Sequence, residues 1–203
     1  MENSKKKKLG IYTGIAVIVI LIIIILCRLC QTNNVTSYFN QDDEGWRIIG
    51  DAQEGNANPD YNKKEGNPGG YISADDDAAG GIWYWSAPKK FLGKKISAYG
   101  QKLEFSLKQS SIENQFDADD IILLGNEKRI AFDLPDNPGI EWTDYSVILD
   151  ENAGWKLNDI NGLKVSKEDF IQVLNNLTTI YIRGEFIEGE DTGGIDSVVL
   201  YLN

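Results

Sequence analysis

The sequence contains no histidine, and its only two cysteines, Cys27 and Cys30, lie near the N-terminus. Without histidine, the chain lacks the side chain most often used as a general base at neutral pH and the commonest zinc ligand. With no cysteine after residue 30, no disulfide bond can form within the remainder of the chain. That remainder must therefore fold around its own hydrophobic core, or around a bound ion.

Motifs that would indicate an enzyme are also missing. There is no nucleophile elbow, no phosphate-binding loop and no cluster of cysteine and histidine. A glycosidase needs only two carboxylates about 5–10 Å apart, and any acidic chain offers such pairs, so their presence identifies nothing. We therefore expect a protein without catalytic activity.

Basic residues are scarce outside the N-terminal segment. Of the 20 lysines and arginines and 31 aspartates and glutamates, residues 1–30 hold five basic and one acidic, a net charge of +4. Residues 31–203 hold the other 15 basic and 30 acidic side chains, a net charge of −15. Nucleic-acid affinity comes largely from lysine and arginine replacing counterions on the phosphate backbone. We therefore expect no nucleic-acid partner.

One long apolar run stands out, because no charged side chain occurs from Leu9 to Cys27. As a helix these residues would rise about 28 Å, at ~1.5 Å each, which is enough to cross a bilayer core. Four lysines at 5–8 precede the run, so the positive-inside rule predicts a cytoplasmic N-terminus. A cleaved signal peptide is the alternative. Leu26-Cys27-Arg28-Leu29-Cys30, however, offers neither a small-residue cleavage site nor the small residue that precedes a lipoprotein cysteine.

These observations predict the domain organisation. A basic cytoplasmic segment over residues 1–8 is followed by a transmembrane signal anchor over 9–30, which makes the lipid bilayer a partner. A polar stalk over 31–37 then leads to one extracytoplasmic domain over 38–203. Cys27 and Cys30 are either apolar residues at the helix end or sites of acylation or of a covalent dimer.

Residues 38–203 show the patterns of an all-β domain. Residues 102–108 alternate apolar and polar side chains without a break, and residues 129–133 and 178–183 alternate similarly. Short β-branched or aromatic runs at 82–85, 120–124, 145–149 and 197–202 lie between loops that contain glycine, proline or asparagine. Many short strands separated by turns indicate a sandwich or barrel.

One short helix interrupts this pattern. Ser166-Lys167-Glu168-Asp169 resembles a capping box, with acidic residues in the first helical turn. Apolar residues then follow at helical spacing, namely Phe170, Val173, Leu174 and Leu177. We expect this helix to pack its apolar face on the sandwich.

The order of these residues resembles the laminin IV type A domain, also called laminin B. The matching segments begin with Trp85-Ser-Ala-Pro88, Phe91-Leu92-Gly93 and Ser97-Ala-Tyr99-Gly100, which leads into Leu103-Glu104-Phe105. They continue in family order and extend over nearly all of residues 38–203, as follows: Asp120–Gly125, Leu149-x-Glu151, Gly154-Trp155, Asp169-Phe170, Val173-Leu174, Leu177, Ile180–Arg183, Val198 and Leu200.

The resemblance implies a jelly-roll β-sandwich, similar to galactose-binding-like and carbohydrate-binding modules. The family occurs in extracellular matrix and cell-surface proteins and has no known catalytic activity. The cysteine-rich EGF-like modules that flank the animal domain are not found in this sequence. We therefore expect a free-standing binding module, preceded by a single transmembrane helix.

Calcium is the one ion that the sequence suggests. Jelly-roll modules similar to this family often hold a structural Ca²⁺ between the first and last strands, with carboxylate and carbonyl oxygens as ligands. Here this would bring the turn of Asn40, Asp42 and Asp43 near Asp196, which we place at the start of the last strand. A solvated acidic surface is the alternative reading of these residues and of the other acidic clusters.

Exposed aromatic side chains are the candidates for ligand binding. Trp46, Trp85 and Trp155 resemble framework positions of the family, so we expect them in the core. Trp83, Tyr84 and Trp142 are the candidates for contact with a sugar ring. Because side chains alternate along a strand, Trp83 shares a face with Trp85 and Tyr84 lies on the other. We expect an extracellular glycan as the ligand, or alternatively a protein partner of an adhesion module.

Two further expectations concern single residues. The sequons at Asn34 and Asn176 would be glycosylated only in a suitable secretory pathway. Arg183 follows the alternation of Ile180 and Ile182 and so faces the other way. We expect it to form an ion pair with a neighbouring strand.

Overall fold

The computed structural model describes residues 34–203 except 53–54, 56 and 77–80. The description below concerns the compact unit Asn34–Asn203. The predicted basic segment, the transmembrane anchor over 9–30 and both cysteines lie outside the described residues. In the part of the chain that is described, no helix is long and apolar enough to cross a membrane.

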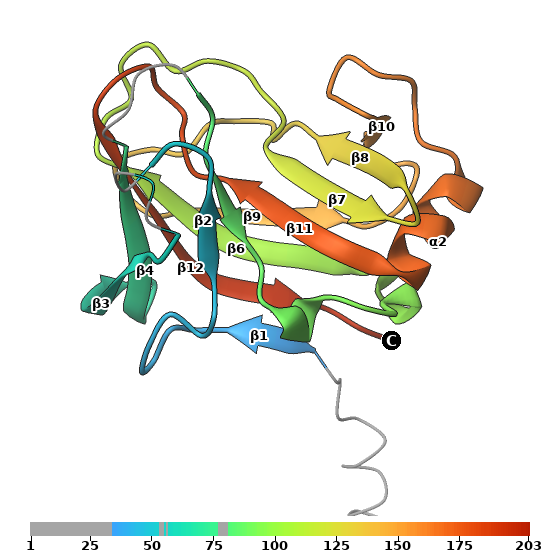
Figure 1. Cartoon of the computed structure of the whole chain (residues 1–203), viewed down its shortest axis with the longest axis horizontal. Helices are drawn as coiled ribbons and strands as arrows, with labels where there is room; N and C mark the ends of the chain where they lie inside the picture. Colours follow the sequence, from blue (N-terminus) through green and yellow to red (C-terminus); the bar gives the residue numbers. More distant parts are fainter. Residues whose placement is uncertain (1–33, 53–54, 56, 77–80) are drawn as a thin grey trace, which may run out of the picture. The chain divides into compact units, whose positions relative to one another are not determined.

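Two antiparallel sheets form the domain (Figure 1). Sheet A has the strand order β3-β4-β12-β6-β9, with β1 paired to β12 outside this path. Its strands are β1 (Val35–Ser37), β3 (Asp60–Gly66), β4 (Gly69–Asp76), β6 (Lys102–Gln109), β9 (Thr143–Ile148) and β12 (Asp191–Leu200).

Sheet B has the strand order β10-β8-β7-β11-β5-β2. Its strands are β2 (Arg47–Ile49), β5 (Tyr84–Ser86), β7 (Ile121–Gly125), β8 (Lys128–Phe132), β10 (Lys156–Leu157) and β11 (Leu177–Arg183). Two 3₁₀ turns, η2 (Lys89–Phe91) and η3 (Ile96–Ala98), lie between β5 and β6. The all-β prediction is confirmed.

One hydrophobic core lies between the two sheets. The predicted alternation of β6 places Leu103, Phe105 and Leu107 inside, where they join Ile180 and Ile182 of sheet B in one cluster. Trp46, Trp85 and Trp155 are fully buried there, which confirms the prediction for these three. The apolar faces of both sheets are therefore removed from water, which is the main stabilising contribution available to a domain without disulfides.

The predicted helix is present as α2 (Lys167–Asn175), at one end of the sandwich beside β7 and β8 (Figure 1). The Ser166 side chain accepts a hydrogen bond from the backbone N–H of Asp169 at 3.1 Å, which is the N-cap that the sequence predicts. Phe170, Val173 and Leu174 are buried, whereas Leu177 is the first residue of β11 rather than part of the helix.

Three boundaries differ from the sequence-based expectation. Residues 35–37 of the predicted stalk form β1, which pairs with β12. Strand β12 begins at Asp191 and runs through Gly193-Gly194, which resemble a loop in the sequence. Strand β3 is polar apart from Tyr61 and Gly66 and gives no strand signal, and it is held in place by its pairing with β4.

Candidate functional site

The three aromatic candidates lie in three different places. Trp83 is fully buried, so the prediction that it contacts a ligand is wrong. Trp83 and Trp85 share the core face, with ring centroids 4.8 Å apart. Tyr84 lies on the opposite side of β5, on the outer face of sheet B, and Trp142 lies immediately before β9 on the outer face of sheet A. No single site can use all three.

Trp142 belongs to a cluster on the outer face of sheet A. Its ring packs edge to face with Tyr71 of β4, with centroids 5.3 Å apart and planes at 82°. The Lys108 ammonium of β6 lies 3.9 Å from the Tyr71 ring centroid and 4.7 Å from that of Trp142, within cation–π range. We call Tyr71, Lys108 and Trp142 the Trp142 cluster. All three side chains are partly exposed.

Two local features hold the Trp142 ring in place. Its indole N–H donates to the backbone carbonyl of Glu65 at 2.9 Å, which ties it to the end of β3. Beneath it lies Gly194 of β12, where a Cβ atom would stand 3.4 Å from the ring and 3.1 Å from Lys108. The absence of a side chain at Gly194 leaves room for Lys108 and the Trp142 ring to lie close to β12.

A polar cavity of about 410 Å³ lies on the same sheet. The Asn67 amide donates to Asp144 at 2.8 Å, and the Ser106 hydroxyl donates to the same carboxylate at 2.6 Å. Ser146 donates to Glu104 at 3.0 Å. Because two carboxylates and one amide from β6, β9 and the β3–β4 turn converge here, the cavity offers several hydrogen-bonding groups to a polar ligand.

A second cavity, of about 280 Å³, lies beside the Trp142 cluster. Tyr71 and Lys108 line it, together with the hydroxyl-bearing residues Ser73, Ser110 and Thr192. The outer face of sheet A therefore combines an aromatic cluster with one polar cavity and one hollow of mixed polar and apolar lining.

The Glu104 carboxylate is an ionised acceptor at neutral pH. Burial raises its pKa, but hydrogen bonds from Tyr201 and Ser146 and the charge of Lys102 outweigh this and hold the pKa below its usual value. The Tyr201 hydroxyl donates to Glu104 at 2.8 Å. This side of the cavity is thus negatively charged.

Asp196 is fully buried, in the middle of β12 rather than at its start, so the predicted position is corrected. Its two oxygens accept backbone N–H groups, from Asn67 at 2.5 Å and from Ser197 at 2.6 Å. The strand register shifts just after it, and Ser197 has φ +53°. This bulge turns the carboxylate toward the β3–β4 turn, which a regular pattern of alternation cannot reveal.

The other predicted calcium ligands use their oxygens locally. Asp42 accepts from the backbone N–H of Glu44, and Asp43 accepts from that of Gly45 and pairs with Arg47 at 3.2 Å. Asn40 is exposed. In the described segments, no group of three or more histidine, cysteine, aspartate or glutamate side chains is arranged to hold a metal ion. Calcium at these residues stays a prediction.

Three buried carboxylates predict how stability depends on pH. Burial, with repulsion from Asp76 and Asp51, raises the pKa of Glu185 to about 7, and burial raises that of Asp196 to about 6. Burial also outweighs the Leu134 hydrogen bond and the Arg183 charge and raises the pKa of Asp120 to about 7. As the pH falls below 8, these carboxylates take up protons in the folded protein. In the unfolded chain they take up protons only near the ordinary carboxylate pKa of about 4, at lower pH. The free energy of unfolding should therefore increase from pH 8 to about pH 5.

Urea unfolding at pH 8, 7, 6 and 5 measures this dependence. Glu185→Gln removes one of the three groups, so its free energy of unfolding should change less over the same range. A wild-type protein that loses stability between pH 8 and pH 5 would contradict the prediction.

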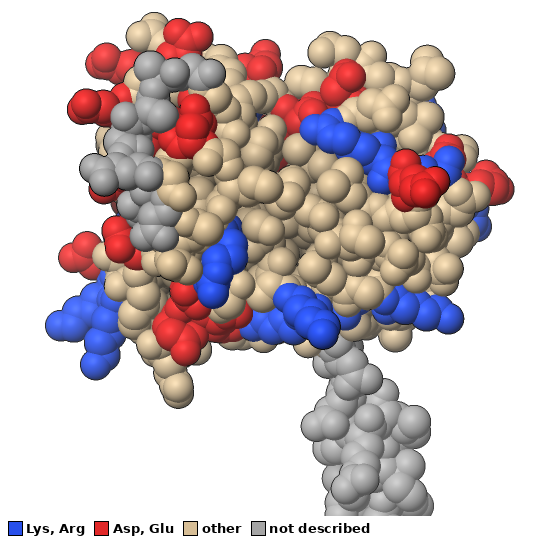
Figure 2. Space-filling model, in the orientation of Figure 1, with Lys and Arg blue, Asp and Glu red and all other residues tan. Residues whose placement is uncertain are grey.

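Tyr84 lies in an apolar groove on the outer face of sheet B. Its ring is 5.9 Å from that of Tyr181, and Ile49, Ile82, Ile122 and Leu124 line the same hollow of about 340 Å³. Burial, with the charge of Asp119 adding to it, raises the pKa of Tyr84 to about 12, so its hydroxyl stays protonated. Figure 2 shows a face of the molecule much of which carries neither acidic nor basic side chains.

The two sequons lie at the surface of the domain. Asn34 is partly exposed, and its side-chain oxygen accepts the backbone N–H of Leu202 at 3.1 Å. Asn176 is exposed and ends α2 as its C-cap residue. Glycosylation at either asparagine stays a prediction.

The family model for laminin B (domain IV) matches residues 84–202. The chain belongs to the laminin B (domain IV) family. The resemblance found in the sequence is thereby confirmed for the greater part of the domain.

Curated relatives of this laminin B domain are much longer proteins. Laminin subunit gamma-1 of Danio rerio is 28% identical over 172 residues, which is 83% of this chain and 10% of that protein. Human laminin subunit gamma-1 is 32% identical over 121 residues, 58% of this chain and 7% of that protein. The basement membrane proteoglycan of Caenorhabditis elegans is 27% identical over 130 residues, 64% of this chain and 4% of that protein.

Among solved structures, the L4b domain of human laminin alpha-2 superposes with a TM-score of 0.66 at 18% sequence identity. The match covers 84% of this chain and 97% of that one. At this identity it shows the fold alone, an all-β sandwich of two sheets.

Sequence reasoning did not single out two members of the Trp142 cluster, Tyr71 and Lys108. Tyr71 alternates with the buried Ile72 and Ala74 and thus stands on the polar side of its strand. An aromatic residue among polar ones on an alternating strand was the available signal. Lys108 gave no signal, because only the pairing of β6 with β12 brings it beside β4.

Proposed function

We propose that this chain is an extracytoplasmic, non-catalytic binding module that recognises a glycan on the outer face of sheet A. Its membership of the laminin B family supports an extracellular structural or adhesive role. The apolar run at residues 9–27 supports attachment to a bilayer with this domain outside.

The observation that carries the proposal is the Trp142 cluster beside the polar cavity and the second hollow. An aromatic ring that is partly exposed on an otherwise polar face offers an apolar surface to the C–H face of a sugar ring. Asp144, Glu104 and Asn67 lie in the adjacent cavity and can bond sugar hydroxyls. Binding sites typically combine such an apolar surface with a few placed polar groups.

Replacing Trp142 by alanine tests this proposal. A glycan array probed with the full chain identifies the ligand, and calorimetry then measures its affinity. Trp142→Ala should weaken binding at least about tenfold, as removal of a central aromatic contact typically does. Tyr84→Ala, on the outer face of sheet B, is the matched control and should leave the affinity unchanged.

Two outcomes would overturn the glycan proposal. One is an array without any ligand for the wild-type chain. The other is a ligand that Trp142→Ala binds as tightly as the wild type does.

A protein contact on sheet B is the second candidate function. The groove around Tyr84 and Tyr181 is lined mainly by apolar side chains, and Ile49 at its edge is 43% exposed. Aromatic and aliphatic side chains of this kind are common in protein interfaces. The variants Tyr84→Ala and Trp142→Ala separate the glycan function from the protein-contact function. If Tyr84→Ala loses adhesion while Trp142→Ala keeps normal adhesion, the result favours a protein partner that binds sheet B.

A further inference from the structure

Strand β9 is an open edge of sheet A. It is last in the strand order and pairs only with β6, in a register that runs without irregularity from Thr143 to Ile148. The backbone N–H of Leu149 donates to the backbone carbonyl of Gln101, so the backbone groups of Leu149 point toward the β6 side. Hydrogen-bonded residues alternate along an antiparallel strand, and therefore the backbone groups of Thr143, Tyr145 and Val147 also form hydrogen bonds with β6.

The backbone groups of Asp144, Ser146 and Ile148 consequently point away from the sheet. The hydrogen bond of the Ile148 carbonyl is consistent with this direction, because the carbonyl accepts the indole N–H of Trp155 at 2.9 Å and not a group of β6. Two N–H groups and two carbonyls, those of Asp144 and Ser146, are thus presented along the edge. Their spacing of two residues, about 6.8 Å, is the repeat of an extended chain.

Two other edge strands in the described part of the domain, β3 and β2, are protected. Strand β3, at the far side of sheet A, carries exposed Lys63 and Lys64 and an irregular register. Strand β2 has only three residues, and the Ile48 N–H donates to the carbonyl of Ala57. Lysines, irregular pairing and short length are the usual means of preventing a second chain from adding to an edge. Strand β9 contains neither lysine nor proline and has no bulge.

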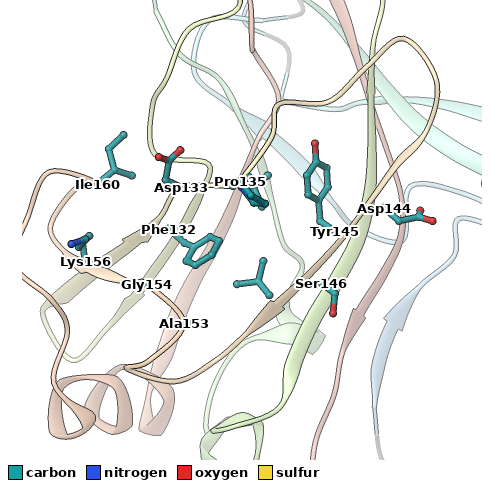
Figure 3. Close-up of a pocket in the computed structure, with 12 residues that line it drawn as sticks. Phe132, Asp133, Pro135, Asp144, Tyr145, Ser146, Ala153, Gly154, Lys156 and Ile160 are labelled. Carbon is teal, nitrogen blue, oxygen red and sulfur yellow. The ribbon is translucent and has the colours of Figure 1, made fainter.

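A cavity of about 600 Å³ lies along this edge. It is bounded on one side by residues 144–147 of β9 and on the other by Phe132–Pro135 and by Ala153, Gly154, Lys156 and Ile160. Figure 3 shows the Phe132, Pro135 and Tyr145 side chains near one another on one side of β9, and those of Asp144 and Ser146 directed away from them. The cavity therefore has an apolar floor beside a row of backbone hydrogen-bonding groups.

We propose that β9 is a docking edge for an extended peptide segment of a partner protein, which adds to sheet A as a further strand. An extended peptide supplies alternating N–H and carbonyl groups at the spacing of those on Asp144 and Ser146, so the two backbones can form an antiparallel or parallel ladder. Every second side chain of the peptide would then face Phe132, Leu134 and Val147, which favours an apolar residue at those positions. This inference does not depend on the glycan proposal.

Ser146→Pro removes one outward N–H group and is the decisive variant. Proline is tolerated on an edge strand where its missing N–H faces outward, and it keeps the preceding Tyr145 extended. Because Ser146 also bonds Glu104 through its hydroxyl, Ser146→Ala is the matched control that loses only this hydroxyl bond. A melting curve for each variant shows whether it is folded.

The probe is an array of synthetic octapeptides in which valine, isoleucine or phenylalanine alternates with threonine, serine or asparagine. The full chain should bind a subset of these, and the amide groups of Asp144 and Ser146 should exchange more slowly with solvent in the complex. Ser146→Pro should weaken binding at least tenfold, and Ser146→Ala should bind about as the wild type does. N-methylation of alternate amides in the peptide should abolish binding, a readout that requires no protein variant.

Three outcomes would overturn the proposal. The first is that the wild-type chain binds no peptide of the array. The second is that Ser146→Pro binds peptide as tightly as Ser146→Ala does. The third is that the amide groups whose exchange slows in the complex lie elsewhere in the domain. If Ser146→Pro fails to fold, the N-methylated peptides alone test whether a backbone ladder forms. Binding of these peptides as tightly as of the unmethylated ones would exclude such a ladder.

Discussion

Replacing Arg183 by alanine is expected to destabilise the domain by about 3–5 kcal/mol, because it leaves Asp120 as an unpaired buried carboxylate. The side chains of Arg183 and Asp120 are 0% and 1% exposed, and the guanidinium lies 2.9 Å from the carboxylate. Arg183 also donates to the backbone carbonyls of Glu185 and Phe116 and lies against the rings of Phe116 and Phe186. The predicted ion pair with a neighbouring strand is thus confirmed, and it joins β11 to the start of β7.

Urea unfolding measures this effect, with the double variant Asp120→Asn and Arg183→Met as control. Removing both charges leaves no isolated ion in the core, so the double variant should lose less stability than Arg183→Ala alone. A loss below about 1 kcal/mol in Arg183→Ala, in the range of an exposed ion pair, would contradict the prediction.

Replacing Trp83 by alanine is expected to cost about 3–5 kcal/mol, as is usual when a buried tryptophan is truncated. The ring fills the space above Gly184, where a Cβ atom would stand only 1.9 Å from it, and it also lies against Gly193. The Trp83 carbonyl accepts the N–H of Gly184 at 3.0 Å. The two glycines and the ring are therefore matched in shape, and the neighbouring backbone has little freedom to fill the cavity.

Trp142→Ala is the control for this prediction, since it removes the same side chain from the surface. Its free energy of unfolding should change by about 1 kcal/mol or less, because a partly exposed ring buries less apolar area. If Trp83→Ala is as stable as Trp142→Ala, then Trp83 is not part of the core. Together the two variants separate loss of folding from loss of ligand binding.

The outer surfaces of the sandwich offer three separate places for contact. The Trp142 cluster lies on sheet A, the Tyr84 groove lies on sheet B, and β9 is an open edge of sheet A. Each can be altered by one substitution outside the core. Ser146→Ala serves both proposals that involve sheet A, because it changes the polar cavity and leaves the backbone edge intact.

Local sequence determined several features of this protein. Alternation placed β6, β8 and β11 almost to the residue, and the capping sequence at Ser166 located α2, because both signals depend on neighbouring residues. The acidity of residues 31–203 and the lack of cysteine there follow from composition alone. The order of aromatic and apolar segments was sufficient to indicate the family.

Only the tertiary structure decided which residues meet. Alternation shows that Trp83 and Tyr84 lie on opposite faces of a strand, but it cannot show which face meets the second sheet. The bulge at Asp196, the pairing of the polar strand β3 and the meeting of Tyr71 with Trp142 all depend on register between distant strands. Register is set by packing and hydrogen bonds across the whole sheet, so no local pattern in the chain encodes it.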